Sequence, residues 1–271
     1  DLSKFGAKYT PPLSPFMLSR RRIARIRSLH RKKERYRHAA FLVEGEKNVR
    51  ELLASRNKVE FVTGLPDRLK ELEHERGAGT PFIESDQPSI QSCSTLQHPE
   101  GILAIAKIPD RPWDPKKFSP NRPWLFFESL SDPGNLGTLL RVGEHFGLEG
   151  LLLSSDSVDP YNPKVVRSSM GSLFRQEVQE KAGSDVIRDA REQGRPVIAT
   201  SSKAPSLYKD PPARNSLLLF GSESQGLSPS LVEEADDSRS LPSLGDVESL
   251  NVAVSAAIFC SELLRADLLD P

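Results

Sequence analysis

Cysteine and histidine are scarce in this chain of 271 residues, and their arrangement excludes several classes of protein. The two cysteines, Cys93 and Cys260, stand far apart and form no C-x-x-C pair, which excludes a disulfide scaffold and favours a reducing compartment. None of the five histidines lies at metal-ligand spacing from another histidine or from a cysteine. We therefore expect no bound metal.

Long apolar runs are also missing. No stretch approaches the roughly 18 apolar residues that a membrane-spanning helix needs, and the chain shows no charged-then-apolar leader of the secretory type. These absences predict a soluble, cytoplasmic protein without a membrane partner.

An excess of charge of either sign is absent too, since Lys+Arg and Asp+Glu both number 37. The balance hides an asymmetry along the chain. Residues 1–60 hold 16 Lys/Arg against 6 Asp/Glu, whereas the remaining 211 residues hold 21 against 31. The charge is therefore segregated by region, with a basic N-terminal part and an acidic remainder.

The length suits two domains, each able to bury an ordinary core. Five prolines between Pro109 and Pro123 interrupt helix and sheet alike, which predicts a stiff linker there. The predicted units are a flexible tail at 1–19, a small α/β domain at 20–108, the linker at 109–122 and a larger domain at 123–271.

In the smaller domain, apolar runs alternate with helical patterns, which is typical of an α/β domain. A basic amphipathic helix is predicted over 20–37, where ten of eighteen residues are Lys or Arg. Further helices are expected at 45–55, 66–76 and 87–93, and strands at 39–43, 59–63, 81–84 and 101–107.

In the larger domain the strand candidates are continuously apolar, which favours a parallel sheet covered on both faces. The expected strands are 124–127, 150–153, 195–200, 216–220 and 238–241. The expected helices are 136–147, 163–170, 184–193, 229–235 and 250–268.

Three polar loops follow apolar strands of this larger domain: 128–141, 221–226 and 241–251. In an open parallel sheet, ligands bind beyond the carboxyl ends of the strands, so these loops are the candidate site. The loops contain neither the lysine of a phosphate-binding P-loop nor a G-x-G-x-x-G fingerprint. Nucleoside triphosphate and dinucleotide ligands are therefore disfavoured.

These loops contain the segments Asn135-x-Gly-x-x-x-Arg141, Gly221-x-Glu-x-x-Gly226 and Pro242-x-x-Gly-x-x-x-Ser-Leu-Asn-Val252. In this order they resemble the SpoU (TrmH-like) branch of the SPOUT RNA 2′-O-ribose methyltransferases. The resemblance covers roughly 123–268. The N-terminal domain, with weaker motifs, is similar to the ribosomal-protein-L30e-like substrate-binding domain often fused to that branch. Gly143 and Glu144 depart from the family pattern, which has small apolar residues there.

The resemblance implies a trefoil-knotted parallel-sheet domain, a homodimer that completes the site, and S-adenosylmethionine as cofactor. Cofactor contacts are implied for a first set: Thr200, Gly221, Leu241 and Leu250. Catalytic roles are implied for a second set: Asn135, Arg141, Glu223, Ser249 and Asn251.

Arg141 is the central residue in this resemblance, and two roles for it stay open. It is either the base that takes the proton of the ribose hydroxyl or a phosphate anchor that polarises this hydroxyl. Guanidinium groups stay protonated in proteins, so we favour the anchor.

The basic segment is the natural RNA contact, because neutralised phosphates supply most non-specific affinity. Its candidate residues are Arg20, Arg21, Arg22, Arg25, Arg31, Lys32 and Lys33. The predicted function is methylation of a ribose 2′-hydroxyl in RNA, with ribosomal RNA favoured over transfer RNA by analogy. Three alternatives are a transfer-RNA 2′-O-methyltransferase, a non-catalytic RNA-binding or ribosome-assembly protein on the same fold, and a nicotinamide-dependent oxidoreductase.

Overall fold

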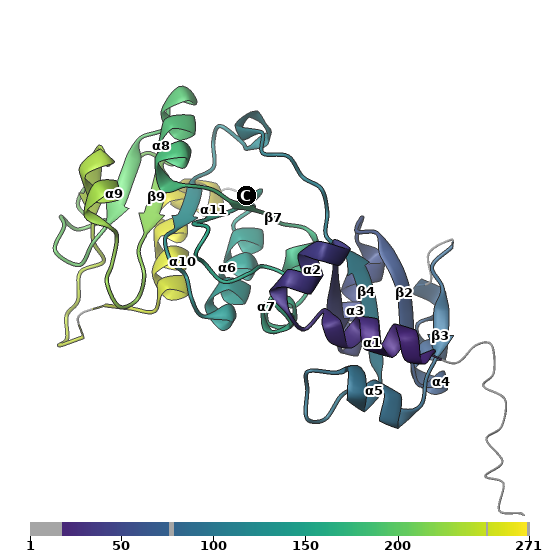
Figure 1. Cartoon of the computed structure of the whole chain (residues 1–271). Coiled ribbons are helices and arrows are strands. Elements are labelled where there is room, and N and C mark those ends of the chain that lie inside the picture. The colour runs from purple at the N-terminus through teal and green to yellow at the C-terminus, as the bar shows by residue number, and fades with distance from the viewer. Residues whose placement is uncertain (1–17, 76–78, 248, 270–271) are drawn as a thin grey trace, which may run out of the picture.

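Two separate β-sheets organise the chain into two α/β lobes that lie side by side (Figure 1). The structure is a computed structural model and describes residues 18–75, 79–247 and 249–269. The predicted tail at 1–19 falls outside the described residues except for its last two.

The N-terminal lobe is a four-stranded sheet between two layers of helices. The strand order is β1-β4-β2-β3, in which β4 runs antiparallel to β1 and β2. The strands are β1 (Ala40–Glu44), β2 (Val59–Gly64), β3 (Phe82–Glu84) and β4 (Ile102–Lys107). The helices are α1 (Arg20–Ser28), α2 (Lys32–His38), α3 (Glu46–Ala54), α4 (Pro66–Glu71), the 3-10 turn η1 (Glu73–Glu75) and α5 (Gln87–Cys93).

Alternation along the strands explains the two helical layers, because successive side chains point to opposite faces of a sheet. Leu42, Leu103 and Ile105 share one buried cluster with Ile26 of α1 and Ile90 of α5. The opposite face, which carries Phe41, Val43 and Ala104, packs against α3 and α4. The α1 and α3 surfaces of the lobe therefore face away from each other.

The single basic helix predicted over 20–37 is wrong, because the chain turns between α1 and α2. We call the turn, residues 29–31, the elbow. The carbonyl oxygens of Leu29 and His30 both accept hydrogen bonds from Nη1 of Arg35, each at 2.9 Å. The Leu29 side chain is fully buried. A charged side chain that turns back toward the interior thus ends the helical run.

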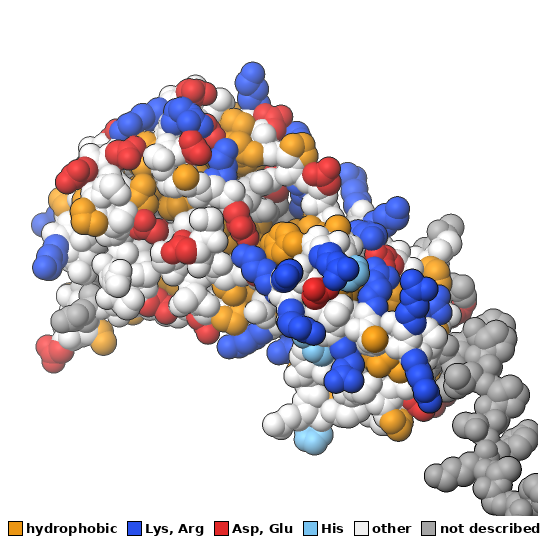
Figure 2. Space-filling model, viewed as in Figure 1, with side chains coloured by type: hydrophobic (Ala, Val, Ile, Leu, Met, Phe, Trp, Pro, Cys, Tyr) orange, Lys and Arg blue, Asp and Glu red, His pale blue; other side chains and the backbone are white. Residues whose placement is uncertain are grey.

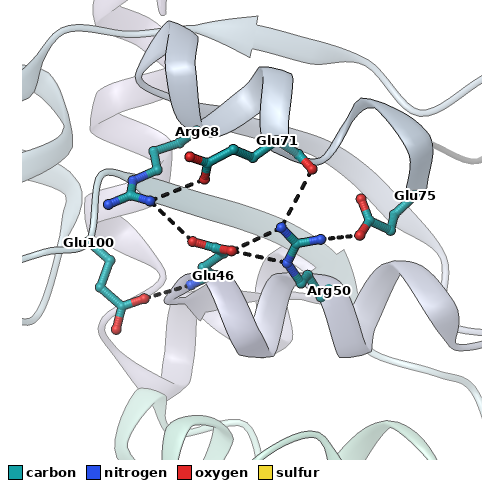
Figure 3. Close-up of polar contacts among 6 residues, drawn as sticks. All are labelled: Glu46, Arg50, Arg68, Glu71, Glu75 and Glu100. Carbon is teal, nitrogen blue, oxygen red and sulfur yellow. Dashed lines mark hydrogen bonds and ion pairs between the residues drawn. The ribbon is translucent and has the colours of Figure 1, made fainter.

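The α3 and α4 surface carries a network of alternating charges (Figure 3). Arg50 bonds to Glu46 and Glu75, and Arg68 bonds to Glu46 and Glu71. The backbone N–H of Glu46 donates to Glu100 at 2.8 Å. Figure 3 therefore shows four carboxylates around two guanidinium groups, a locally negative surface.

The C-terminal lobe is built on a six-stranded sheet in which all strands run parallel, in the order β10-β8-β9-β5-β6-β7. The strands are β5 (Trp124–Phe127), β6 (Gly150–Leu153), β7 (Glu177–Glu180), β8 (Val197–Thr200), β9 (Leu217–Phe220) and β10 (Asp237–Arg239). The helices are α6 (Pro133–His145), α7 (Pro163–Ser168), η3 (Ser172–Phe174), α8 (Gly183–Glu192), α9 (Pro229–Glu234), α10 (Val252–Leu263) and α11 (Arg265–Leu269).

The parallel sheet expected from the apolar runs is confirmed. Strand β7 was not predicted, because its sequence Glu177-Val-Gln-Glu180 is polar and only partly buried at the edge of the sheet. The predicted helix over 250–268 is in fact two helices, since α10 ends at Leu263 and α11 follows it.

The segment between β4 and β5 includes the short 3-10 turn η2 (Pro115–Lys117) and lies against the C-terminal lobe. The ring of Trp113 packs on Phe118 and Trp124 at centroid distances of 5.1 and 5.5 Å, and its Nε1 donates to Asp189 at 2.7 Å. The buried guanidinium of Arg195 donates to the carbonyls of Ser119 and Arg122. The predicted linker is thus fixed by packing.

The two lobes share one continuous apolar core. Phe41 of β1 packs on Tyr161 and Phe174 of the C-terminal lobe, with ring centroids 4.9 and 6.4 Å apart. A bond from Leu207 N–H to the carbonyl of Ser240 joins the loops after β8 and β10. The trefoil knot expected in this region stays a prediction.

Candidate functional site

The candidate site lies where neighbouring parallel strands of the C-terminal sheet end. Thr200 ends β8, Gly221 follows β9 and Leu241 lies two residues beyond β10. The pairing of Thr200 with Arg239, and of Ala199 with Leu219, aligns these three strand ends. The sheet therefore brings three of the four predicted cofactor residues to one edge. The fourth, Leu250, is exposed in the loop that leads into α10.

Gly221 permits a tight turn directly after β9. Ser222 and Gly226 exchange backbone hydrogen bonds of 3.0 and 2.9 Å, which close the turn that carries Glu223. A Cβ atom at position 221 would lie 2.0 Å from the carbonyl carbon of Gly226. Only glycine fits here, and the turn then holds Glu223 at the mouth of the strand ends.

A chain of hydrogen bonds joins three of the predicted catalytic side chains. Nδ2 of Asn135 donates to Oε1 of Glu223, and Nδ2 of Asn251 donates to Oδ1 of Asn135 at 2.9 Å. These residues come from three segments separated by 88 and 116 positions in the sequence. We call Asn135, Glu223 and Asn251 the amide–carboxylate cluster.

Helix ends position two members of this cluster. Oδ1 of Asn251 caps α10 by accepting the N–H of Ala253 at 2.9 Å. Asn135 lies in the first turn of α6, where its N–H donates to the capping carboxylate of Asp132 at 2.9 Å. Asn135 is therefore anchored through its backbone N–H, and Asn251 through its side-chain oxygen, which leaves the Nδ2 group of Asn251 for the cluster.

Arg141 and Ser249 are not joined to this cluster. Both are exposed, and neither side chain makes a hydrogen bond or ion pair within residues 18–75, 79–247 and 249–269. Arg141 stands six residues after Asn135, about 9 Å along the helix axis and about 120° around it. The guanidinium is thus free to meet a group that approaches the exposed side of α6.

Gly137, the glycine of the first signature segment, lets α6 approach α7. A Cβ atom at position 137 would lie 1.9 Å from Oγ of Ser168. That hydroxyl donates to the carbonyls of Pro133 and Lys164, at 3.2 and 2.8 Å. Helix α7 therefore holds the start of α6 at a fixed distance.

Helix α6 begins at Pro133 and not at the predicted residue 136, and Asp132 is its N-cap. An Asp followed by Pro is the usual pattern for such a start and could have identified it. Glu128 was missed as well. Its carboxylate accepts the N–H of Ser228 at 2.7 Å and so ties β5 to the segment after the Gly221 turn.

The predicted RNA-contact residues differ in their freedom to bind. A first group is exposed and has no side-chain hydrogen bond or ion pair among the described residues; it comprises Arg20, Arg21, Arg31 and Lys33. A second group is engaged. Arg25 pairs with Glu60 at 2.5 Å, Arg22 lies 5.8 Å over the ring of Phe61, and Lys32 is 3.8 Å from Glu180.

Neither a group of three or more potential metal ligands nor a helix of membrane-spanning length and apolarity occurs in the part of the chain that the structure describes.

Family models match both lobes. The model of the SpoU rRNA Methylase family matches residues 123–261, just over half of the chain. The chain belongs to the SpoU rRNA methylase family. A second model, the MRM3-like substrate binding domain, matches residues 20–104. The resemblance drawn from the three signature segments is therefore confirmed.

Individual relatives agree with this assignment. The 23S rRNA (guanosine(2553)-2′-O)-methyltransferase RlmP of Bacillus subtilis is 30% identical over 88% of this chain and 93% of its own. A putative RNA methyltransferase of the TrmH family from Porphyromonas gingivalis superposes with a TM-score of 0.82 at 34% identity, over 92% of this chain and 99% of its own.

A third relative was solved with its cofactor. The AdoMet-bound rRNA methyltransferase of Sinorhizobium meliloti superposes with a TM-score of 0.81 at 26% identity, over 92% of this chain and 97% of its own. The predicted fold class, a SPOUT domain with a smaller N-terminal α/β domain, is confirmed by these superpositions.

Proposed function

We propose that this protein is an enzyme that transfers a methyl group from S-adenosylmethionine to a ribose 2′-hydroxyl of ribosomal RNA. The observation that carries this proposal is the amide–carboxylate cluster, because it unites all three signature segments of the family at one end of the parallel sheet. The relatives named above, an rRNA 2′-O-methyltransferase and an AdoMet-bound rRNA methyltransferase, support the same reaction and cofactor.

The residues at the strand ends fit S-adenosylmethionine. Leu241 is half-buried against the core, and the loop that follows it carries three exposed apolar side chains, Leu244, Val247 and Leu250. Such a surface suits an adenine ring, while the backbone of the turn at 221–226 offers polar groups. Thr200, Gly221, Leu241 and Leu250 are the proposed contacts. When bound, the cofactor supplies an electrophilic methyl group on its sulfonium.

Transfer forms the new bond from the ribose oxygen to the methyl carbon, breaks the bond from sulfur to that carbon, and releases S-adenosylhomocysteine together with the hydroxyl proton, which passes to water. The chain itself must orient the ribose for this step. Glu223 accepts a hydrogen bond from Asn135, whose oxygen accepts one from Asn251, so the three side chains fix one another. This arrangement pre-organises polar groups at the site, which is worth several kcal/mol in reactions that depend on positioning. Arg141 serves as a phosphate anchor, in keeping with the absence of a side-chain partner for it among the described residues. Ser249 is a further proposed contact.

We propose that RNA binds the α1 and elbow surface. Figure 2 shows lysine and arginine side chains gathered over α1 and α2. The opposite surface of the lobe, on α3 and α4, carries the four-carboxylate network and would repel phosphates (Figure 3). The principal proposed contacts are Arg20, Arg21, Arg31 and Lys33, whose side chains have no ion pair among the described residues, with Arg22, Arg25 and Lys32 as weaker ones.

We further propose that the active form is a homodimer. Helix α10 is apolar nearly all round, yet Val254 is 47% exposed, and Leu250 just before it is 48% exposed. A helix of this kind is usually covered on all sides. A second copy placed against α10 and α6 would cover this surface. It would also bring side chains of the second copy toward Arg141. Cytoplasmic location stays a prediction from the sequence.

Calorimetric titration with S-adenosylmethionine and, separately, with NAD tests the cofactor. Transfer of a labelled methyl group to unmodified ribosomal or transfer RNA tests the substrate. We expect binding of S-adenosylmethionine only, transfer to ribosomal RNA, and a fall in kcat of about 100-fold in Asn135→Ala with little change in cofactor affinity. Cofactor binding without transfer to any RNA would instead support a non-catalytic RNA-binding protein.

A further inference from the structure

Helix α2 carries two kinds of basic side chain. Lys33, and Arg31 just before the helix, are exposed and available to a ligand. Arg35 lies in the same basic stretch, but its side chain is only 3% exposed. A buried arginine in a helix whose other basic side chains are mostly exposed has a role that overall charge does not explain.

The guanidinium of Arg35 joins the elbow to the C-terminal lobe. Its Nε donates to Oδ2 of Asp159 at 2.7 Å, and its Nη2 donates to the same oxygen. Its Nη1 holds the elbow carbonyls of Leu29 and His30. Burial and the Asp159 carboxylate raise the pKa of Tyr36, so the Tyr36 hydroxyl stays protonated and donates to Oδ1 of Asp159 at 3.1 Å.

A series of close contacts leads from Asp159 to the amide–carboxylate cluster. Asp159 precedes α7, and its Oδ1 also accepts the N–H of Tyr161 at 3.0 Å. Helix α7 ends at Ser168, which leaves no room for a Cβ atom at Gly137 of α6. Asn135 lies two residues before that glycine. Because each contact is tight, a displacement of the elbow would be transmitted to the cluster.

A second connection fixes the other end of α6. Arg175 donates to Glu51 of α3 at 2.6 Å and to Glu144, near the end of α6, at 3.2 Å. Glu144, which departs from the family pattern, therefore links the helix of Asn135 and Arg141 to the N-terminal lobe. The start of α6 is thus connected to Arg35 indirectly, through α7 and Asp159, and its end is connected to α3 directly, through Arg175.

A buried ion pair contributes little net stability, because desolvation offsets the attraction of its charges, but it does enforce one geometry. From this we infer that Arg35 is a positioning residue: through Asp159 it holds the basic elbow at a fixed distance from the amide–carboxylate cluster, so that bound RNA presents a single ribose. The inference rests on the proposed function. It assigns Arg35 to the choice of nucleotide and not to cofactor binding or proton transfer.

The test compares Arg35→Lys and Asp159→Asn with Arg195→Lys as a matched control. Arg195 is also buried and donates to the carbonyls of Ser119, Arg122 and Asn215, but it lies away from the contact between the lobes. The probe is unmodified 23S ribosomal RNA of Bacillus subtilis, transcribed in vitro. Methylated nucleotides are mapped one by one, and kcat and KM are measured below the unfolding temperature of each variant.

Both interface variants should lower kcat by about 10-fold or more, with KM for RNA changed far less, and should spread methylation to neighbouring nucleotides. Affinity for S-adenosylmethionine should stay within about 2-fold of the wild type, because the strand ends are untouched. The Arg195→Lys control should lower the unfolding temperature yet keep one methylated nucleotide. A single site and wild-type kcat in both interface variants, or equal losses in the control, would overturn the assignment.

Amide hydrogen exchange provides a readout that needs no activity. We expect faster exchange over residues 133–137 and 159–168 in the interface variants, and unchanged exchange there in Arg195→Lys. This result would support the link between Arg35 and the amide–carboxylate cluster even if the wild-type protein methylated no part of the probe. Absence of transfer by the wild type would then contradict the proposed function alone. Unchanged exchange would refute the role of Arg35.

Discussion

Replacement of Gly137 by alanine offers a sharp test of how the site is built. The added Cβ would lie 1.9 Å from Oγ, 2.6 Å from Cβ and 2.8 Å from the carbonyl carbon of Ser168. Ordinary van der Waals contact needs at least 3.4 Å, so α6 and α7 must separate or Ser168 must move. Overpacking of this kind costs about 3 kcal/mol, near the top of the usual range, because backbone is among the clashing atoms.

A loss of about 3 kcal/mol corresponds to a fall in Tm of roughly 6 to 12 °C in a protein of this size. Differential scanning calorimetry measures it, with Thr138→Ala as the control on the exposed side of the same helix. The control should change stability by less than about 0.5 kcal/mol. Because Gly137 stands two residues from Asn135, methyl transfer should also fall, even well below Tm.

The double variant Gly137→Ala with Ser168→Gly separates the clash from other causes. Removal of the serine side chain eliminates the contacts at 1.9 and 2.6 Å and leaves only the one at 2.8 Å to the backbone. We expect about half of the lost stability to return. A Gly137→Ala variant that unfolds within 1 °C or so of the wild type would refute the close approach of the two helices.

Three further outcomes follow from the cited contacts. The N–H of Asn135 holds the pKa of the Asp132 carboxyl below its ordinary 3.8. The stabilising effect of this cap is therefore complete above about pH 5 and is lost as the pH falls through the lowered pKa. The difference in Tm between the wild type and Asp132→Asn should shrink over the same fall in pH. Asn251→Ser should keep the α10 cap and hence Tm within about 2 °C, yet lower kcat about 100-fold. Burial lowers the pKa of Arg195 to about 10. Arg195→Met leaves three buried carbonyl oxygens without their donor, so the free energy of unfolding in urea should fall by at least about 2 kcal/mol.

The bounds of a strand could be predicted from the sequence where both faces of the strand are buried. Strands β5 and β6 have the bounds predicted from their apolar runs, because a strand covered on both faces is apolar throughout. Strand β7 carries no such signal. It pairs with β6 at the edge of the sheet, and its backbone is held by partners that the local sequence does not reveal.

The candidate site was predictable only in part, because its contacts join residues that lie far apart in the sequence. Resemblance nominated Asn135, Glu223 and Asn251, but their mutual hydrogen bonds depend on how distant loops meet. The break between α1 and α2 was not predictable, because Arg35 looks like its solvated neighbours in sequence. Its partner, Asp159, lies 124 positions away, and only the folded chain shows why this one arginine turns inward.

The clustering of both tryptophans has a practical consequence for spectroscopy. Trp113 and Trp124 are the two tryptophans of the chain, and their rings stand 5.5 Å apart beside the C-terminal sheet. Tryptophan fluorescence, excited selectively, thus reports on one small region of the protein. Fraying of the N-terminal lobe would leave the emission spectrum unchanged, so a signal from that lobe requires a dye or a tryptophan introduced there.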